Sequence, residues 1–437
     1  MTAKPPSETV VIGLGYIGLP TAIALAEAGD HVLGVETNPD RVAQIASGDV
    51  PSLEPGLHAA LARVQQGGRL HVADQPGQAR QFLIAVPTPL GPQNSPDIRH
   101  IDAAVHALAP HLRPGNLVIL ESTCPVGTTE VVRDQLAQLR PDLRLPYAGA
   151  EGADIALAYC PERVLPGRIL QELIGNDRCI GGITPACTQR AKDFYAKFVT
   201  GVCATTTART AELVKLAENC FRDVNIAFAN ELSLAAERLG VNIWEAIQLA
   251  NHHPRVDILQ PGPGVGGHCI AVDPWFLIHG QAGDMPLLRT ARSVNQAKTR
   301  HVIDQITHQM GAAPDVRVAL LGLSFKADCD DLRESPALAI AQNLARDFGP
   351  RLLLVDPYVA ALPTQLQGSG ANLVALEDAL SSAGFIVLLV DHAPFRAINP
   401  SDLADKRLYD TRGIWTGSAT ESTFGCQALA AGFGNGK

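Results

Sequence analysis

One stretch near the start of the chain constrains the fold most, because it joins a strand, a glycine-rich turn and a helix. The β-branched run Thr9–Ile12 leads directly into the hexapeptide GLGYIG, and an alanine-rich helix is expected from about residue 19 to residue 28. The next strand, HVLGVE, closes on Glu36. The hexapeptide supplies the glycines of a dinucleotide-binding turn: Gly13, Gly15 and Gly18. This order predicts a βαβ unit that binds a dinucleotide.

The acid at the end of the second strand favours NAD over NADP. A carboxylate about 20 residues past the glycines accepts hydrogen bonds from ribose hydroxyls and repels a 2′-phosphate, so Glu36 predicts NAD. Two further apolar runs, FLIAVPTP and NLVILESTCPVG, are typical of parallel strands buried on both faces. Ligands bind at the carboxyl ends of such strands. We therefore expect Thr88 and Thr123 beside the cofactor, although both also suit ordinary loop or cap positions.

A long helix is predicted from residue 208 to residue 239, with threonines 205–207 as its cap and Gly240 as its stop. It would span about 48 Å, long enough to join two domains. The helix is apolar around most of its circumference, which predicts burial, partly against another subunit. Three polar side chains share one face at i, i+4 and i+7: Lys215, Asn219 and Arg222. On an otherwise apolar helix, this stripe indicates a site more than a solvated face.

The most specialised stretch is GPGVGGHCIAVDPWF, residues 262–276. Its four glycines would let the backbone approach a ligand closely, and Cys269 is followed by an acid, Asp273. Cys269 is thus a candidate nucleophile, with a small buried thiol as the alternative. Before the long helix, Glu162 and Arg163 follow the apolar run IALAYC, as an opposite-charge pair that belongs either to a site or to a solvated turn.

The strand-turn-helix pattern recurs in the last third of the chain. VRVALLGLSFK is a strand and a turn, Ser335 and Pro336 suit a helix start, and RLLLVDP ends in Asp356. FIVLLVDH and RLYDTRGIW add strands. This second turn lacks the dinucleotide glycines but carries Lys326 and Arg333, so we expect it to bind a phosphate group of a different ligand.

Composition limits the partners. A net charge of −9 argues against a nucleic-acid surface. The start, MTAKPPSETV, lacks a signal-peptide core, and no apolar run reaches the length of a membrane helix, so we expect a cytoplasmic protein without a membrane partner. The nine cysteines form no C-x-x-C pair, so most are expected to be buried thiols. No metal is expected, because one candidate zinc set matches no common ligand spacing: His252, His253, His268 and Cys269.

With these segments in place, the chain resembles the UDP-glucose/GDP-mannose dehydrogenase family, whose members oxidise a nucleotide-sugar alcohol twice to a uronic acid. The resemblance covers nearly the whole chain, with the family's motifs in order: GLGYIGLP, ESTCPVGTTE, CPERVLPG, the helix with Lys215 and Asn219, GPGVGGHC, and GLSFK followed by LRES. Within the family, GVGGHCIAVDPWF, HHPRV and CPERVLPG are most similar to the UDP-N-acetyl-D-mannosamine dehydrogenases. His268 and residues 270–272 depart from the UDP-glucose version, which more often has a serine before the cysteine and a lysine shortly after it.

The resemblance implies a role for each matching residue. Cys269 would be the nucleophile, Lys215 and Asn219 would assist proton transfer and stabilise oxyanions, and Asp273 and Glu162 would place or activate water, with Thr123 also in the catalytic set. The implied contacts to the sugar nucleotide are Arg163, Val164, Lys215, Asn219, Arg222, His253, Arg255, Gly266, Phe325, Lys326 and Arg333. The implied contacts to NAD are Gly13, Gly15, Tyr16, Ile17, Gly18, Glu36, Arg41, Thr88 and Thr129, and Arg333 is counted in this set as well. Many relatives have aspartate where this chain has Glu36, which leaves the geometry of ribose recognition open.

The expected fold is α/β, with two doubly wound Rossmann-like domains joined by a long central helix. The expected divisions are an NAD-binding domain (1–204), a helical linker and dimerisation domain with the cysteine loop (205–311) and a UDP-sugar-binding domain (312–437). Residues 416–437 are small and polar, and we expect much of this tail to be disordered. A homodimer through the long helix is expected.

The implied reaction is the NAD-dependent, four-electron oxidation of UDP-N-acetyl-D-mannosamine to its uronate through a thiohemiacetal and a thioester on Cys269, for surface polysaccharide biosynthesis. UDP-N-acetylglucosamine or UDP-glucose is the alternative substrate. Two alternatives of other classes stay open. A single-step hydroxyacid dehydrogenase of similar fold would use only a lysine and leave Cys269 incidental, and a non-catalytic NAD-binding partner protein would use neither.

Overall fold

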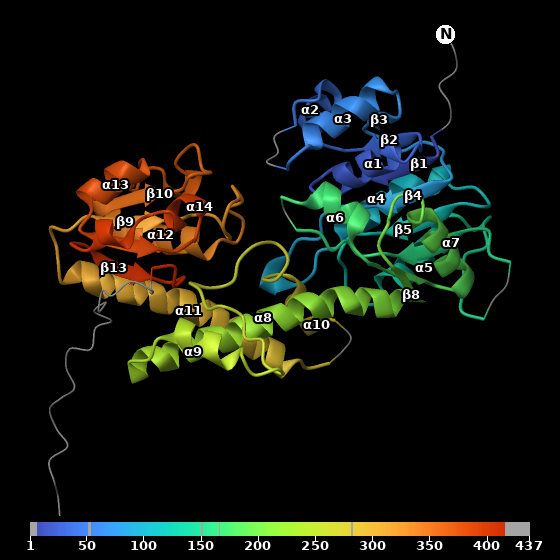
Figure 1. The fold of residues 1–437 in the computed structure, drawn as a ribbon. Coiled ribbons are helices and arrows are strands. Elements are labelled where there is room, and N and C mark those ends of the chain that lie inside the picture. The colour runs from blue at the N-terminus through green and yellow to red at the C-terminus, as the bar shows by residue number, and fades with distance from the viewer. Residues whose placement is uncertain (1–6, 51–53, 150–151, 166, 281–282, 416–437) are drawn as a thin grey trace, which may run out of the picture. The chain divides into compact units, whose positions relative to one another are not determined.

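The computed structural model describes residues 7–50, 54–149, 152–165, 167–280 and 283–415 (Figure 1). The chain divides into two compact units. The first unit comprises residues 1–218 and 275–284, and the second comprises residues 219–274 and 285–437. The tail 416–437, for which disorder was expected, lies outside the described residues. Among the described residues, no helix is long and apolar enough to cross a membrane.

The first unit is built on a sheet that has eight strands among its described residues, in the order β3-β2-β1-β4-β5-β6-β7-β8. The strands are β1 (Thr9–Ile12), β2 (Val32–Val35), β3 (Leu70–Ala73), β4 (Gln81–Ile84), β5 (Leu117–Leu120), β6 (Ala156–Tyr159), β7 (Arg178–Gly182) and β8 (Cys203–Thr207). Neighbouring strands run parallel except β6 and β7. The predicted parallel strands of this half are confirmed.

Helices cover both faces of this sheet, because successive strand residues point to opposite sides. Val11 packs with α1, α3 and α7, whereas Val10 and Ile12 pack with α4 and α5. The helices of this unit are α1 (Gly18–Glu27), α2 (Pro39–Ser47), α3 (Leu57–Gln66), α4 (Arg99–Leu108), α5 (Thr128–Leu139), α6 (Ile169–Gly175) and α7 (Pro185–Tyr195). Two apolar layers with a mostly parallel sheet between them form the core.

The second unit repeats this architecture on a smaller scale. Its described residues form a parallel sheet in the order β11-β10-β9-β12-β13. One face packs on α11 and α12 and the other on α13 and α14. The elements are α9 (Ile243–Ala250), α11 (Pro286–Gly311), β9 (Val318–Leu321), α12 (Pro336–Phe348), β10 (Leu352–Val355), β11 (Asn372–Leu373), α13 (Leu376–Ser382), β12 (Phe385–Leu388), α14 (Ala393–Arg396) and β13 (Arg407–Asp410). The predicted second doubly wound domain is confirmed.

The two doubly wound halves share a detail at the first turn of each sheet. In the first unit, Leu14 N donates to the carboxylate of Glu36, 3.2 Å away. In the second, Leu323 N donates to Asp356 at 2.8 Å. An acid at the end of the second strand therefore fixes the turn after the first strand in both halves. The predicted helix start is also confirmed, since the Ser335 hydroxyl accepts from Leu338 N.

The long helix α8 (Ala208–Leu239) begins and ends where the sequence predicts. The hydroxyl of Thr207 accepts from Thr210 N at 3.2 Å, and Gly240 follows the helix at φ 67°. In the single chain, Phe221 and Phe228 are 65% and 49% exposed, so the expected burial of this part of α8 against another subunit stays a prediction. In the second unit, α8 contacts α11 through buried polar groups, since Arg292 donates to Asp223 at 2.7 Å and Asn230 donates to Asn295 at 2.9 Å.

Candidate functional site

The glycines of the first turn have three different physical roles. Gly13 has φ +90°, and a Cβ there would lie 2.6 Å from the carbonyl oxygen of Ala85. A Cβ on Gly18 would lie 1.8 Å from the carbonyl oxygen of Gly13, so α1 packs against the turn without room for a side chain. A Cβ on Gly15, by contrast, would meet nothing within 4 Å. Gly15 thus marks the open side of the turn, where a pyrophosphate can approach the backbone.

The carboxylate of Glu36 is held beside this turn. One oxygen accepts from Leu14 N, and the other accepts from Asn38 N at 3.0 Å. The neighbouring Arg41 lies in the first turn of α2, and Tyr16 is 40% exposed on the glycine turn. An open glycine face and a fixed carboxylate at the carboxyl edge of the sheet fit the phosphates and ribose of NAD.

The structure joins two threonine-containing loops at the carboxyl ends of β4 and β5. The hydroxyl of Thr88 donates to the carbonyl oxygen of Thr123 at 2.7 Å. Thr129 is fully buried, and its backbone N and hydroxyl both donate to Glu212 on α8. The sequence analysis missed Glu212, which stands three residues before Lys215 and so extends the predicted polar stripe of the helix by one turn.

Glu162 lies in the loop after β6, close to Lys215 of α8. The Lys215 ammonium donates to the carbonyl oxygen of Glu162 at 2.7 Å. Burial raises the pKa of the Glu162 carboxyl to about 7, while the charges of Lys215 and Arg178 oppose the rise. A carboxyl with this pKa can take up and release a proton near neutral pH, as a general base requires.

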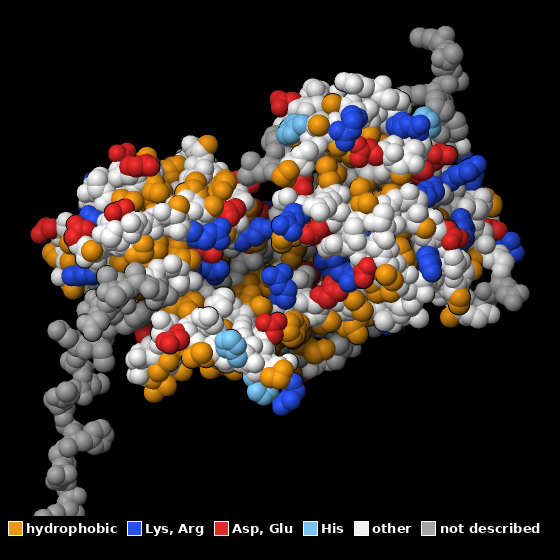
Figure 2. Space-filling view, in the orientation of Figure 1, with side chains coloured by type: hydrophobic (Ala, Val, Ile, Leu, Met, Phe, Trp, Pro, Cys, Tyr) orange, Lys and Arg blue, Asp and Glu red, His pale blue; other side chains and the backbone are white. Residues whose placement is uncertain are grey.

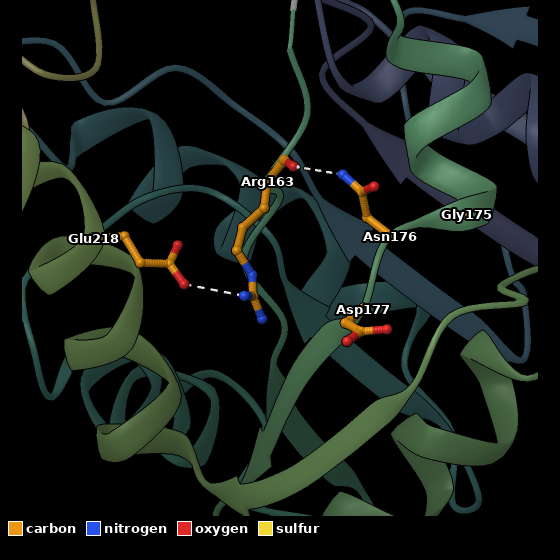
Figure 3. A pocket seen from close by; sticks show the side chains of 5 residues that line it. All are labelled: Arg163, Gly175, Asn176, Asp177 and Glu218. Carbon is orange, nitrogen blue, oxygen red and sulfur yellow. Dashed lines mark hydrogen bonds and ion pairs between the residues drawn. The ribbon is translucent and has the colours of Figure 1, made fainter. Parts of the chain in front are cut away.

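Arg163 extends into a pocket of about 510 Å³ on the first unit (Figure 3). Its guanidinium lies 3.0 Å from the Glu218 carboxylate on α8, and its carbonyl oxygen accepts from the side-chain amide of Asn176 at 3.0 Å. Gly175 and Asp177 complete the lining. Glu218 is a further residue that sequence reasoning missed, although it stands three residues after Lys215 and four before Arg222 and so lies on the same helix face as the predicted polar stripe.

In the second unit, Cys269 lies on an exposed part of its loop, and a short helix, α10 (Asp273–Ile278), begins directly after it. The carbonyl oxygen of Cys269 accepts from Asp273 N at 2.8 Å. The Asp273 carboxylate is 2% exposed and accepts from the side-chain amide of Asn219 at 2.5 Å. These contacts tie the cysteine loop to α8 and bring together three of the predicted catalytic residues.

The glycines of the cysteine loop approach other parts of the protein, where the sequence suggested a ligand. A Cβ on Gly264 would lie 2.2 Å from the Thr299 hydroxyl of α11. A Cβ on Gly266 would lie 2.3 Å from the carbonyl oxygen of Glu334, and one on Gly267 would lie 2.8 Å from the Phe325 ring. These glycines thus allow the loop to pack tightly against the rest of the second unit, and this packing fixes the position of Cys269.

The loop that carries Lys326 and Arg333 lies beside the cysteine loop. Asp331 links the two, because its carboxylate binds the Arg333 guanidinium at 2.7 Å and lies 3.6 Å from the imidazole of His268. Burial lowers the pKa of Lys326, while Cys329 and Cys269 oppose that change. Asp331 was not predicted, and its only signal was its place in an acidic run before Arg333.

Four further residues predicted to contact the sugar nucleotide make fewer contacts with the other site residues that the structure describes. Arg222 is exposed on α8 and contributes to the electrostatic environment of Lys326. His253 and Arg255 are exposed in the segment after α9, and Arg255 N donates to His253 Nδ1 at 3.3 Å. Val164 donates its backbone N–H to the Glu162 carboxylate.

A doubly wound sheet whose first turn has an open glycine face and a fixed carboxylate is typical of NAD-binding proteins. The chain belongs to the UDP-glucose/GDP-mannose dehydrogenase family, because the family's NAD binding domain matches residues 7–199, its central domain residues 209–297 and its UDP binding domain residues 319–417. The predicted family, fold class, cofactor and enzyme class are confirmed.

Similar proteins carry two kinds of name. The chain is 50% identical over 406 residues to an NDP-N-acetyl-D-galactosaminuronic acid dehydrogenase of Ralstonia nicotianae, covering 93% of this chain and 96% of the relative. It is 48% identical over 413 residues to the UDP-N-acetyl-D-mannosamine dehydrogenase of Escherichia coli, covering 93% and 98%. The solved UDP-D-ManNAc dehydrogenase of Pyrococcus horikoshii is similar at a TM-score of 0.83 and 38% identity, with 93% and 96% covered.

Proposed function

We propose that this enzyme oxidises UDP-N-acetyl-D-mannosamine to UDP-N-acetyl-D-mannosaminuronate and supplies the product to surface polysaccharide biosynthesis. The observation that carries the proposal is the exposed Cys269, on a loop held through Asp273 to Asn219 of α8. Relatives named UDP-N-acetyl-D-mannosamine dehydrogenase, at 48–50% identity and near-complete coverage, support this choice of substrate.

The chemistry explains why a cysteine is needed. Two molecules of NAD, bound one after the other, would each accept one hydride, so the reaction would consume two NAD per sugar. The primary alcohol loses its first hydride and a proton to give an aldehyde. The Cys269 thiolate then adds to the aldehyde carbon, which gives a thiohemiacetal with a second transferable hydride. Loss of that hydride forms a thioester, and water cleaves it to the uronic acid and regenerates the thiol.

The remaining residues have roles in proton transfer and charge stabilisation. Lys215 and Asn219, one turn apart on α8, stabilise the developing oxyanions. Glu162 takes a proton from the water that cleaves the thioester, and Asp273 holds the Asn219 amide in place. Thr123, whose carbonyl oxygen already binds Thr88, completes the catalytic set at the end of β5.

The binding residues fall into two sets. NAD contacts Gly13, Gly15, Tyr16, Ile17, Gly18, Glu36, Arg41, Thr88 and Thr129. The sugar nucleotide contacts Arg163, Val164, Lys215, Asn219, Arg222, His253, Arg255, Gly266, Phe325, Lys326 and Arg333. Arg333 was expected in both sets, and its loop supports the sugar nucleotide. The loop keeps the strand-turn-helix pattern of a phosphate site but lacks the dinucleotide glycines.

The functional divisions are an NAD-binding segment (1–204), a central segment (205–311) and a UDP-sugar-binding segment (312–437), which the three family matches support. A homodimer forms through the long helix α8, against which α9 packs. The support is apolar surface on these helices, some of which is visible in Figure 2. The exposed apolar side chains are Leu213, Phe221, Phe228, Leu239 and Leu249. The enzyme acts in the cytoplasm, without nucleic-acid or membrane partners.

The substrate proposal is tested by measuring NADH release with UDP-N-acetylmannosamine, UDP-N-acetylgalactosamine, UDP-N-acetylglucosamine and UDP-glucose. The highest kcat/KM is expected for UDP-N-acetylmannosamine, with two NADH per sugar. UDP-N-acetylgalactosamine is the second candidate, because a relative that is 50% identical is named for a galactosaminuronic acid. A higher kcat/KM for UDP-glucose would reject UDP-N-acetylmannosamine as the preferred substrate. Release of one NADH per sugar would reject the four-electron reaction.

A further inference from the structure

A buried cluster of polar residues lies at the carboxyl edge of the first sheet, beneath the Glu162 loop. β7 runs antiparallel to β6, so Arg178, its first residue, lies at the edge where β5 and β6 end. Tyr159 pairs with Gly181, and extending that register past the strand brings Arg178 level with Glu162. Glu121 follows β5 at the same edge.

The alternation of strand residues places this cluster on the α7 side of the sheet. Ile119 and Ile180 belong to the apolar layer under α7, and Glu121 and Arg178 each stand two residues from one of them. Tyr195 of α7 closes the cluster from above. Its hydroxyl donates to the Glu121 carboxylate at 2.5 Å, and its ring centroid lies 5.5 Å from the Arg178 guanidinium carbon.

The charges of this cluster are buried and only partly bonded. Arg178 and Glu121 are 2% and 4% exposed. The Arg178 Nη2 group donates to the carbonyl oxygen of Leu173, but within the described residues its Nε and Nη1, one oxygen of Glu121 and one oxygen of Glu162 are buried without a hydrogen-bond partner. A guanidinium keeps its charge in proteins and, when buried, requires a counter-charge. Glu121 supplies it.

Cys160 and Tyr195 cannot supply a negative charge for Arg178, because both stay protonated at neutral pH. Burial raises the pKa of Cys160 to about 12 and that of Tyr195 well above its usual value. Burial also raises the pKa of Glu121, but the charge of Arg178 and the Tyr195 hydrogen bond oppose it. The cluster therefore places a buried guanidinium, level with Glu162, and a buried carboxylate at the same sheet edge, where the two groups attract each other through space and are not joined by a direct hydrogen bond or ion pair among the described residues.

We propose that Arg178 and Glu121 are positioning residues that set the charge state of the Glu162 carboxylate from beneath the sheet edge. The proposal rests on the proposed role of Glu162 as the base for thioester hydrolysis. It extends that role to a pair that touches neither substrate nor cofactor. The two charges act in opposite senses, because a cation below Glu162 favours its carboxylate and an anion favours its protonated form.

The groups that face Glu162 come from each neighbouring element. They are Lys215 from α8, Arg178 from β7, Glu121 from the end of β5 and the backbone N–H of Val164 from its own loop. Lys215, Arg178 and Val164 lower the pKa of Glu162, whereas burial and Glu121 raise it to its value of about 7. Removing one of these charges should therefore shift the pKa of Glu162. Loss of a cation should raise it, and loss of Glu121 should lower it.

The test compares Arg178→Met, Glu121→Gln and the double variant with the wild-type enzyme. Glu121→Gln keeps an oxygen for the Tyr195 hydroxyl, Arg178→Lys restores the charge, and Lys192→Met on α7 controls for the loss of a distant cation. Two readouts are needed. Infrared difference spectroscopy, assigned with Glu162→Gln, follows the titration of the Glu162 carboxyl, and the pH dependence of kcat for aldehyde oxidation follows catalysis.

Arg178→Met should move the Glu162 titration upward by about one pH unit or more, and Glu121→Gln should move it downward. The double variant and Arg178→Lys should lie near the wild type. Should Arg178→Met fail to fold, Glu121→Gln and the double variant still decide the matter. Equal titrations in all variants, or shifts of the same sign in both single variants, would overturn the inference. Titrations that shift as expected while the kinetic profile stays fixed would support the inference and reject Glu162 as the base.

Discussion

At the scale of the residue, the environment separates Cys269 from the other thiols that the structure describes. Cys160 and Cys220 are buried, and burial raises the pKa of each to about 12, so neither forms a thiolate at neutral pH. Cys269 is exposed on a loop whose backbone is fixed by Asp273. Because the thiolate is the nucleophile, an accessible thiol in a fixed position is the one that can attack an aldehyde.

We therefore predict that Cys269→Ala lowers the rate of uronic acid formation by at least about 10³-fold, or about 4 kcal/mol of transition-state stabilisation, because only an adduct gives the aldehyde carbon a second hydride. Product mass spectrometry in a single-turnover assay measures this loss. Cys203→Ala, a partly buried thiol of β8, is the matched control and should keep the wild-type rate. Near wild-type acid formation by Cys269→Ala would make Cys269 a packing residue.

At the scale of the element, two glycines of one turn should respond in opposite ways to the same substitution. Gly18→Ala forces a methyl group against the carbonyl oxygen of Gly13 and should lower the free energy of unfolding by about 1–3 kcal/mol or more. Gly15→Ala meets open space, so stability should hold while KM for NAD rises about tenfold, equal to about 1.4 kcal/mol. Thermal melts and NAD titrations of both variants measure this. A loss of stability in Gly15→Ala would contradict the assignment of its open face.

The contact of α8 with α11 contains a buried lysine that should make stability depend on pH. Lys298 donates to the Ser233 hydroxyl at 2.8 Å, and burial lowers its pKa from 10.5 to about 8, with Glu237 opposing. Between pH 8 and 10.5 the unfolded chain holds a proton that the folded chain has lost, so stability rises with pH, by about 1.4 kcal/mol per unit at most. This contribution is full above pH 10.5 and is lost as the pH falls toward 8.

We predict that Lys298→Met removes this rise, which urea unfolding between pH 7.5 and 10 measures, with about 3 kcal/mol as the upper bound across the window. Lys192→Met, a lysine substitution on α7, should keep the wild-type slope. Parallel slopes for Lys298→Met and the wild type would mean that Lys298 keeps an ordinary pKa in the folded chain.

At the scale of the whole molecule, the exposed apolar side chains of α8 and α9 require an explanation. Phe221 and Leu249 are 65% and 62% exposed, which is unusual for large apolar residues on adjacent helices. We predict that the double variant Phe221→Asp/Phe228→Asp converts a dimer into a monomer, measured by light scattering after gel filtration. Val131→Asp on α5, at 45% exposure, should leave the dimer intact. A wild-type monomer at micromolar concentration would reject the dimer outright.

The sequence by itself determined much of this protein because the decisive signals are local. Continuous apolar runs, the glycine turn and the acid Glu36 predict the first doubly wound domain, and Ser335 with Pro336 marks the helix start in the second. The ends of α8 also follow from local chemistry, since a threonine cap and a glycine stop act on their own backbone neighbours. Resemblance to a family then supplied the candidate site residues.

Only the tertiary structure decided the contacts that join residues distant in the chain. No local pattern distinguishes Arg178 or Glu121 from ordinary strand-end residues, and their placement at the same sheet edge depends on β7 running antiparallel to β6. The glycines of the cysteine loop were read as space for a ligand, whereas Glu334 and Phe325 occupy that space. Burial is equally a property of the fold, and burial is the main cause of the raised pKa of Glu162. Local sequence fixes backbone geometry, but only packing fixes which charges share a low-dielectric interior.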